Sequence, residues 1–598
     1  MKLPLLFLLV FAYFGVLGQN QTSEKCGSSI NYEKLQKYNP ALLNYFKEID
    51  RKAAEYSEKQ TQGQISPKSI PNTGTIVTIP VVVHVIHNGE PVGVGRNISD
   101  DQITSQIAVL NEDYRRLNAD RVNTPSEFAG VAADTKIEFR LACTDPNGNP
   151  TNGIRRVQGN FSSYTVVSNP DGTVNEASTS IKANDPAWNR DQYLNIWTCD
   201  LNLGVLGYAT FPGGAANVDG VVVQYNAFGR TGNVSSPYNK GRTATHEVGH
   251  WLSLFHIWGD DGSACTGTDQ VADTPNQGGN YVGQCPSGQK SSCGTSNMYM
   301  NYMDYTDDAC MNLFTTGQMN RMKALFLPGG ARSGFVQLSD ISGIGTICDN
   351  NNYTFSVTSS ATSLNWTVSN LTIVSGQGTN TLTVKRIFNG PATITVRAGG
   401  LCMSKTIAVG PPQFAGFLVN GQSTSNGTGC TNSYIPIAAV PNDPSSNYYW
   451  SQSDPNGFIA NASQSSTAFT GYNASCYYLN VSISNVCGSR SENLTICLNS
   501  CFAKYTVFPN PANDYITIDF DHIESAESLP DEIVLLSEKS TKTIKSVNVQ
   551  SVYKNNGLKN GKQIEIDVKE LPRGTYYLHV KNSRLKDKEL DVIRILLQ

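Results

Sequence analysis

The segment Thr245-His-Glu-Val-Gly-His-Trp-Leu-Ser-Leu-Phe-His256 decides how the chain is interpreted. Three of the seven histidines in the sequence fall here, His246, His250 and His256. Side chains four residues apart lie on one face of a helix, about one turn from each other, so the first two imidazoles can bind one metal ion. We therefore predict a helix that begins near Thr243 and carries a metal site.

Glu247 lies beside the first of these histidines. On the helix it faces the open coordination position, where a carboxylate can accept a proton from bound water as a general base. His256 reaches the same ion only if the chain leaves the helix after His250 and turns back. The short motif alone could be a chance match, and the third histidine argues against that. The pattern predicts a zinc site of three imidazoles.

Further segments accompany the motif, namely Ile79-Pro-Val-Val-Val-His84, Asp273-Thr-Pro275 and Asn301-Tyr-Met-Asp-Tyr305. Together with His246 to His256 they resemble the pappalysin family of metzincin peptidases. The resemblance covers roughly residues 77 to 328. It implies zinc-dependent hydrolysis of protein or peptide substrates, a bound calcium ion, and cleavage before basic side chains.

The resemblance also gives roles to residues beyond the histidines. Met303, on a tight turn, would pack beneath the zinc ligands, and Tyr305 would bring its phenol toward the metal or a developing oxyanion. Asp307 and Asp308 follow closely enough to line the primed side of the pocket, where negative charge would select Lys or Arg after the cut bond. Solvated surface aspartates are the alternative for this pair.

The loop between the histidines and the methionine offers a calcium site and two disulfides. Asp269, Asp273 and Thr274 are candidate calcium ligands, because a hard cation such as calcium prefers oxygen ligands. A plain turn is the alternative for these residues. A second zinc site of four thiolates is the alternative to the disulfides that the family pattern implies, Cys265–Cys293 and Cys285–Cys310.

One residue departs from the family pattern. The usual glycine between the second and third histidines is Ser253 here. A positive φ at a non-glycine residue costs about 1 kcal/mol, which a packed site tolerates.

Two other classes of protein stay open: an adhesin or binding protein with a degenerate protease domain, and a metal-stabilised structural module of the cell surface. Glu247 argues against both, because a structural zinc site does not use a free carboxylate.

The N-terminus has the pattern of an export signal, with Lys2, an apolar run from Leu3 to Val16, and Gly18 before polar residues. The run is shorter than the about 20 residues that a membrane anchor needs, and no other segment is long and apolar enough for a transmembrane span. We predict that residues 1–18 are a cleaved signal. In an oxidising compartment the 14 cysteines are disulfide candidates first.

Residues 19–75 are predicted to form a removable pro-segment. A helical-looking stretch, Asn31 to Glu58, precedes a polar linker, Thr61 to Gly74. Cys26 lies in Lys25-Cys-Gly-Ser28, and its thiolate could take the position of the zinc-bound water and keep the precursor inactive. Similar cysteine–glycine pairs do this in related metalloproteases. An ordinary disulfide partner is the alternative.

At 598 residues the chain is too long for one core, so we expect about three to five domains. Its net charge of −4 gives no indication of nucleic acid or an anionic membrane as a partner. Residues 76–330 are predicted to be an α+β catalytic domain. Its expected elements are strands at Thr75–His87, Thr135–Leu141 and Tyr193–Thr198, a helix capped by Ser99, and the motif helix.

An internal repeat follows residue 330. Cys348, Trp366 and Cys402 are matched by Cys430, Trp450 and Cys487 at offsets of 82 to 85 residues. A tryptophan between two cysteines is typical of immunoglobulin-like sandwiches, which we place at 331–412 and 413–501. The pattern predicts the disulfides Cys348–Cys402 and Cys430–Cys487, with chance alignment of unrelated β domains as the alternative. The pairing of the other cysteines stays open: Cys143, Cys199, Cys476, Cys497 and Cys501.

Residues 502–598 resemble the C-terminal sorting domain of proteins exported by the type IX secretion machinery. The resemblance rests on Pro509-Asn-Pro-Ala512, on Gly574-Thr-Tyr-Tyr577, and on a short terminal strand. It implies a secreted or cell-surface protein of a Gram-negative, Bacteroidota-like bacterium, with this small β-sandwich removed after export.

Overall fold

The computed structural model describes residues 25–29, 32–62, 76–431, 433–443, 445–499, 505–520, 529–538, 540–581 and 590–598. The predicted export signal and nearly all of the predicted linker lie outside these residues. The described chain forms two compact units. The first holds the residues up to Gly343 with Asn352–Lys385 and Thr393–Thr406, and the second holds Ile344–Asn351, Arg386–Ala392 and the residues from Ile407 on.

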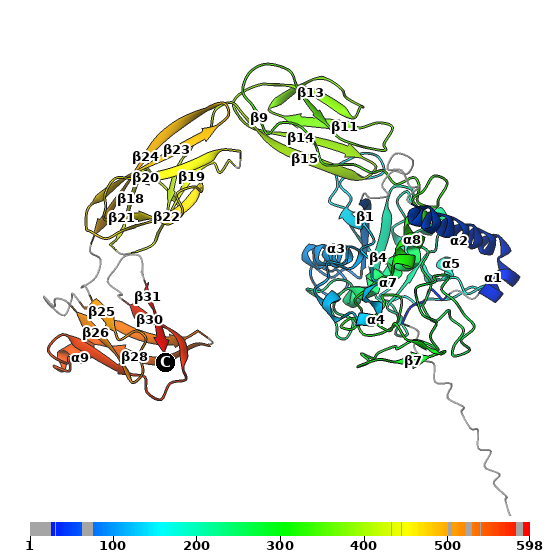
Figure 1. The fold of residues 1–598 in the computed structure, drawn as a ribbon, viewed down its shortest axis with the longest axis horizontal. Helices are drawn as coiled ribbons and strands as arrows, with labels where there is room; N and C mark the ends of the chain where they lie inside the picture. Colours follow the sequence, from blue (N-terminus) through cyan, green and yellow to red (C-terminus); the bar gives the residue numbers. More distant parts are fainter. Residues whose placement is uncertain are drawn as a thin grey trace, which may run out of the picture. The chain divides into compact units, whose positions relative to one another are not determined.

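A mostly parallel sheet organises the catalytic domain (Figure 1). Its strand order is β2-β1-β4-β6-β5, and β3 pairs with the second half of β1. Strand β5 alone runs antiparallel to its neighbour and forms one edge. Ten of the eleven residues of β1 are buried, which explains its unbroken apolar sequence. The strands are β1 Val77–His87, β2 Ile137–Leu141, β3 Ile154–Gln158, β4 Leu194–Cys199, β5 Gly207–Ala209 and β6 Val221–Gln224.

Two helices of this domain begin with side-chain caps. Ser99 accepts a hydrogen bond from the backbone nitrogen of Gln102 at the start of α3, as predicted, and Thr315 forms a reciprocal capping box at α8. The motif helix, α7, begins at Arg242 and is buried along its whole length. The helices are α3 Asp100–Tyr114, α4 Ser126–Ala129, α5 Glu176–Thr179, α6 Ile181–Asn184, α7 Arg242–Trp251 and α8 Thr316–Ala324, with a short hairpin of β7 Ser291–Ser292 and β8 Thr295–Ser296.

The helical stretch predicted near the N-terminus forms α1 (Tyr32–Tyr38) and α2 (Pro40–Thr61). Phe46 of α2 is fully buried between Phe211 and Phe255, with ring centroids 5.7 and 5.6 Å away. Asp50 pairs with Arg321 of α8. The helices of the predicted pro-segment are therefore docked on the catalytic domain through an apolar contact and an ion pair.

The predicted repeat is visible in the two β domains that follow. One sheet has the order β11-β14-β15-β9 in the first domain and β20-β23-β24-β18 in the second, each with a parallel pair at its end. Trp366 and Trp450 occupy corresponding strands, β11 and β20, are 1% exposed, and each donates its indole N–H to a backbone carbonyl. The equal strand order supports a structural repeat and not a chance alignment.

The strands of the first β domain are β9 Thr346–Ile347, β10 Tyr353–Ser356, β11 Asn365–Ser369, β12 Leu371–Ser375, β13 Thr381–Arg386, β14 Gly390–Ala398 and β15 Leu401–Val409. Those of the second are β16 Gly416–Val419, β17 Gln422–Ser423, β18 Asn426–Cys430, β19 Ile435–Val440, β20 Asn447–Gln452, β21 Gly457–Ile459, β22 Ser466–Gly471, β23 Cys476–Asn485 and β24 Gly488–Asn499.

The disulfides predicted for the repeat are wrong. Cys402 pairs with Cys143, Cys348 pairs with Cys487, and Cys430 is disulfide-bonded but not to Cys487. Cys402 is half-buried between the inward-facing Leu401 and Met403, and Cys487 lies in the turn between β23 and β24. Neither side chain reaches the core beside the tryptophan, so neither can bridge the two sheets. A further disulfide, Cys476–Cys497, joins β23 to β24.

The last domain is a small sandwich with sheets β25-β26-β29 and β28-β27-β30-β31. Its core is apolar and includes Ile516, Ile533 and Leu578. The elements are β25 Tyr505–Phe508, β26 Tyr515–Phe520, β27 Glu532–Ser537, β28 Ser540–Asn548, α9 Val549–Lys554, β29 Gln563–Asp567, β30 Gly574–Lys581 and β31 Leu590–Leu597. Among the described helices, none has the length and apolar character that a bilayer span requires.

The disulfide Cys143–Cys402 spans the junction after the catalytic domain, and this gives a direct prediction. We expect that a chain cut at a site-specific protease sequence inserted between the exposed residues Ser339 and Asp340 stays in one piece on a non-reducing gel and separates with reductant. The matched control carries Cys143→Ser and Cys402→Ser and should separate without reductant. If the cleaved chain that keeps both cysteines separates without reductant, the pairing is contradicted.

Candidate active site

Helix α7 brings the three predicted histidines together. Their Nε2 atoms lie 3.0 Å (His246–His250), 3.1 Å (His250–His256) and 3.3 Å (His246–His256) apart. Ligands at about 2.05 Å around a tetrahedral zinc ion are separated by about 3.3 Å, so the spacing fits that ion. All three side chains are buried.

The second nitrogen of each ring is hydrogen-bonded away from this centre. The Nδ1 atoms of His246 and His250 lie 2.7 and 2.8 Å from the carbonyl oxygens of Tyr302 and Leu254, and Nδ1 of His256 lies 2.7 Å from Asp260. These oxygens only accept, so Nδ1 carries the proton and Nε2 presents a lone pair. Three buried lone pairs that face one another require a cation. The residues therefore fit a metal ion without rearrangement.

The chain leaves the helix through the predicted turn. Ser253 has φ of 72°, and its carbonyl oxygen accepts a hydrogen bond of 2.6 Å from Arg321 Nε. Arg321 also stacks over the ring of Phe255, 4.8 Å from its centroid. These contacts hold the left-handed turn that returns His256 to the site, so the packed surroundings offset the strain of a non-glycine residue.

Met303 packs against helix α7. A Cβ atom placed on Gly249, between the first two histidines of α7, would lie 2.5 Å from Met303 Sδ. A glycine at this helix position therefore gives the methionine room to approach the backbone. Tyr305 is buried, with its ring centroid 4.9 Å from that of His256 and 4.7 Å from that of Trp258. The phenol thus faces the metal site from the loop after Met303.

Glu247 does not join the three imidazoles and lies against edge strand β5. A Cβ atom on Gly207 would lie 2.7 Å from Glu247 Cγ, so the glycine makes room for this side chain. Burial raises the pKa of Glu247 to about 8, and hydrogen bonds from Cys26 and Ser28 oppose that shift. The same burial, with the neighbouring imidazoles, lowers the pKa of His246 and His250 well below the usual range. A buried carboxyl beside a cation site is suited to proton transfer.

Comparison with known proteins agrees with this geometry. A family model described as pregnancy-associated plasma protein-A matches residues 176–326. An extracellular metalloprotease of Arthroderma gypseum is 31% identical over 290 residues, which are 46% of this chain and 82% of that protein. One of Verticillium alfalfae is 44% identical over 258 residues, 42% of this chain and 76% of that protein. The chain belongs to the pappalysin family of metallopeptidases.

Other parts of this pappalysin match further models. A PKD-like domain model matches residues 335–409, and a secretion system C-terminal sorting domain model matches residues 506–593. A solved structure, Tannerella forsythia mature mirolysin in complex with a cleaved peptide, is 52% identical and covers 44% of this chain and 96% of that chain, with a TM-score of 0.40. The protein is a secreted or cell-surface metalloendopeptidase with a type IX secretion signal, and peptides are its substrates.

The segment around Cys26 runs through the site as an added strand. Cys26 bridges to Gly207 in parallel orientation, and backbone hydrogen bonds join Gly27 N to Gly207 O (2.9 Å) and Leu206 N to Lys25 O (2.8 Å). The Cys26 thiol lies within 4.8 Å of the three histidine nitrogens and 3.4 Å from Glu247 Oε2. Burial raises the pKa of the Cys26 thiol well above its usual value, and a cation would favour the thiolate.

Lys25 was not singled out by the sequence. It is 5% exposed, donates 2.9 Å to the carbonyl oxygen of Thr306, and lies 4.5 Å from the ring centroid of Tyr238. Burial lowers the pKa of Lys25, and the charges of Asp308, Asp304 and Asp307 oppose that shift, in decreasing order. The only signal in the sequence was its position next to Cys26.

The two aspartates predicted for specificity lie near this ammonium. Asp308 is fully buried, its Oδ2 accepts from the backbone nitrogens of Lys240 and Arg242, and its Oδ1 has no hydrogen-bond partner among the described residues. Asp307 is half-buried and also has one buried oxygen without a partner there. Asp304, which was not predicted, accepts from Gln277, Tyr281 N and Tyr305 N and fixes the turn.

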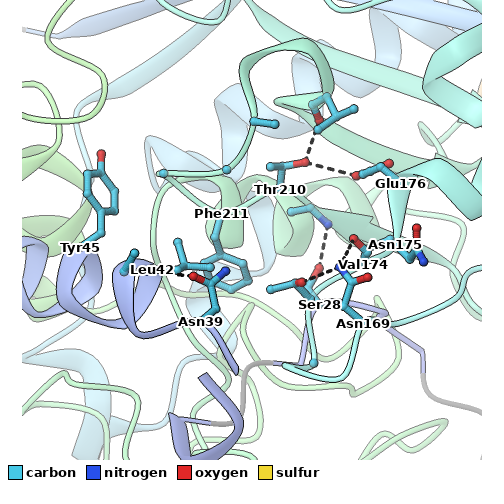
Figure 2. A pocket seen from close by; sticks show the side chains of 18 of the residues that line it. Ser28, Asn39, Leu42, Tyr45, Asn169, Val174, Asn175, Glu176, Thr210 and Phe211 are labelled. Carbon is cyan, nitrogen blue, oxygen red and sulfur yellow. Dashed lines mark hydrogen bonds between the residues drawn. The ribbon is translucent and has the colours of Figure 1, made fainter. Parts of the chain in front are cut away.

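On the other side of Cys26 the cleft stays hollow. A cavity of about 660 Å³ lies between the pro-segment and the chain that follows β5 (Figure 2). Figure 2 shows Ser28, Asn39 and Tyr45 of the pro-segment on its wall, with Thr210 and Phe211 of the catalytic domain. Ser28 Oγ accepts a 2.7 Å hydrogen bond from Ala209 N, which anchors this end of the segment.

The candidate calcium residues do not converge as one ligand set. Thr274 donates to Asp269 Oδ2 at 2.7 Å, so these two lie together. Both oxygens of Asp273 instead accept from the start of α8, from Thr315 Oγ1 (2.6 Å) and Gly317 N (2.8 Å). The calcium assignment stays a prediction, and of the three candidate residues only Asp269 and Thr274 lie together. The nearby cysteines pair as the family implies, Cys265 with Cys293 and Cys285 with Cys310.

Asp113 is another buried residue to which the sequence gave no role. It lies on α3 and accepts hydrogen bonds of 2.8 Å from Thr245 Oγ1 and from the hydroxyl of Tyr302. Arg242, at the start of α7, pairs with the same carboxylate at 3.2 Å. Because the carbonyl of Tyr302 orients His246, Asp113 ties the motif helix to the methionine turn.

Proposed function

We propose that this pappalysin cuts protein chains before Lys or Arg and that its precursor is kept inactive by residues 25–28. The observation that carries the proposal is the placement of Cys26 within 4.8 Å of the three histidine nitrogens, while the buried ammonium of the preceding Lys25 is hydrogen-bonded to Thr306 O and feels the charges of Asp308, Asp304 and Asp307. A buried position that accepts a lysine of the precursor among these negative charges would also suit a basic side chain of a substrate.

The three Nε2 atoms would hold one zinc ion. Zinc bound there lowers the pKa of a bound water toward about 7 and polarises a carbonyl group. Glu247 is placed to accept a proton from the attacking water and to deliver it to the leaving nitrogen. The Tyr305 hydroxyl, which now donates 3.3 Å to the carbonyl of Cys26, would donate to the oxyanion when the pro-segment is gone.

The direction of the pro-segment would protect it from cleavage. It runs parallel to β5, from Lys25 near the aspartates to Ser28 at the cavity. A substrate with its basic side chain after the cut bond near Asp308, and its preceding residues in the cavity, would run the opposite way. The backbone of the pro-segment therefore passes Glu247 in the direction opposite to that of a substrate.

The test is a mass-spectrometric survey of peptides released from a denatured proteome by the mature enzyme. We expect Lys or Arg at the first position after most cuts, and no release with a zinc chelator. Cuts without preference for a basic residue would contradict the specificity but leave the peptidase assignment intact. We also propose that Asp269 and Thr274 bind calcium. The test is the melting temperature of the chelated protein, which should rise when calcium is added.

Replacing Asp308 should weaken this specificity. We expect Asp308→Asn to lower kcat/KM for a Lys or Arg peptide about 10- to 100-fold, because a charge-assisted contact to a buried ammonium contributes about 1.5–3 kcal/mol. Asp307→Asn is the matched control with a smaller effect, since its charge acts less on Lys25. An equal loss on a peptide with a neutral residue after the cut bond would assign Asp308 to folding instead.

A further inference from the structure

The second β domain carries almost no charge. Between residues 413 and 499 the charged side chains are Asp443, Asp454, Arg490 and Glu492. Asp443 accepts from Ser445 and Ser446 of its own loop, Asp454 accepts from the backbone nitrogen of Asn456, and Arg490 pairs with Glu492. Every one of these charges is engaged within the domain. The surface therefore matches a neutral partner and gives little attraction to an ionic one.

On one of its two sheets, three large aromatic side chains are nevertheless exposed: Tyr434 (68%), Phe458 (54%) and Tyr472 (51%). They gather on the sheet β17-β16-β19-β22-β21. In its core, Phe469 of β22 pairs with Ile435 on one side and Ile459 on the other. One residue further along each strand, where side chains point outward, come Tyr434, Thr470 and Phe458.

The register places the three rings close together. Phe458 pairs with Thr470, and Tyr434 directly precedes Ile435, so these two rings flank Thr470 across the sheet. Tyr472 follows two residues after Thr470 and donates its backbone N–H to Asn456 O at 2.9 Å. With about 4.8 Å between strands and about 3.3 Å per residue, the platform measures roughly 10 by 7 Å. Figure 1 shows β19, β21 and β22 side by side.

The chemistry of this platform fits a sugar chain. A pyranose has an apolar C–H face, which stacks on an aromatic ring, and a rim of hydroxyls, which need neutral donors and acceptors. Thr470 supplies such a group between two of the rings, and the exposed Asn456, whose amide donates to Asp454, lies next to Tyr472. A protein partner instead buries about 800 Å² per side with a polar, charged rim, which this surface lacks.

We propose that the outer face of this sheet binds a neutral polysaccharide, with Tyr434, Phe458 and Tyr472 as stacking residues. The domain would then hold the peptidase at a glycan-coated surface. This inference does not depend on the specificity proposed above.

Affinity gel electrophoresis of the full-length chain tests the proposal, with Glu247→Gln present to prevent self-digestion. The probes are β-glucan, xylan, galactomannan and dextran in the gel, with chitin and cellulose in a pull-down. We expect retention by at least one of them and a tenfold or greater loss of affinity with Tyr434→Ala, Phe458→Ala and Tyr472→Ala combined. The matched control combines Tyr449→Ala and Tyr478→Ala, which are 62% and 71% exposed on the other sheet, and should bind as before.

Several outcomes would overturn the proposal: no retention by any probe, equal retention of the triple variant, or an equal loss in the control. Purified mucin from which sialic acid has been removed distinguishes binding to a neutral glycan from binding to a protein. Retention that disappears when the mucin is deglycosylated supports the proposal, and retention that survives deglycosylation assigns the surface to a protein. Equal melting temperatures of the variants show that the domain remains folded.

Discussion

Replacing Glu247 by Gln is expected to lower kcat of the mature enzyme about 10²- to 10⁴-fold while one zinc ion per chain is retained. Glutamine has the shape of glutamate but cannot accept the proton of the attacking water. Zinc should stay bound because the imidazoles are oriented by Tyr302, Leu254 and Asp260, and Glu247 contributes to none of these hydrogen bonds.

The measurement is hydrolysis of a Lys or Arg peptide together with zinc analysis of the same sample. Glu127→Gln, at an exposed glutamate on α4, is the matched control and should match the unmodified enzyme. Loss of zinc together with activity would assign Glu247 to the metal site instead. Full activity of the variant would remove it from the mechanism altogether.

Replacing Cys26 by Ala should shorten the time to activation of the precursor at least about tenfold. The thiol is the group of the pro-segment that lies among the histidines, and its thiolate would compete with water for zinc. The segment should still dock, because the hydrogen bonds from Gly27 N and to Lys25 O use only backbone atoms. The remaining latency should therefore fall further with Lys25→Ala, which removes the buried ammonium and its hydrogen bond to Thr306 O.

Activation is followed by the appearance of the processed form on gels and by peptide hydrolysis over time. Cys199→Ala is the matched control, since Cys199 is the other free, buried cysteine among the described residues and is not part of the histidine group. An unchanged activation time in Cys26→Ala would disprove the switch, and the same acceleration in Cys199→Ala would indicate general destabilisation.

The local parts of the site could be predicted because covalent geometry fixes them. A spacing of four residues on a helix places His246 and His250 on one face, and the return of His256 demands a turn, which Ser253 provides with a positive φ. Capping by Ser99 follows from its side chain and the next few residues in the same way.

The disulfides of the β domains could not be predicted on these grounds. Equal spacing of cysteines and tryptophans correctly indicated two similar folds, yet a disulfide depends on where two side chains point across long sequence separations. Cys348 and Cys487 are 139 residues apart, and Cys143 and Cys402 are 259 residues apart. The pattern of cysteines within one repeat therefore does not show which cysteine side chains face each other in the fold.

The sequence by itself determined the group of three histidines, the peptidase family and the order of the matched domains, because these depend on residue type and short spacing. Only the tertiary structure decided that Lys25 is buried against the carbonyl oxygen of Thr306, that Asp273 accepts hydrogen bonds from the start of α8, and that Tyr434, Phe458 and Tyr472 share one face. Such relations arise when distant segments pack together, and the free energy of that packing depends on the whole fold and not on any local pattern.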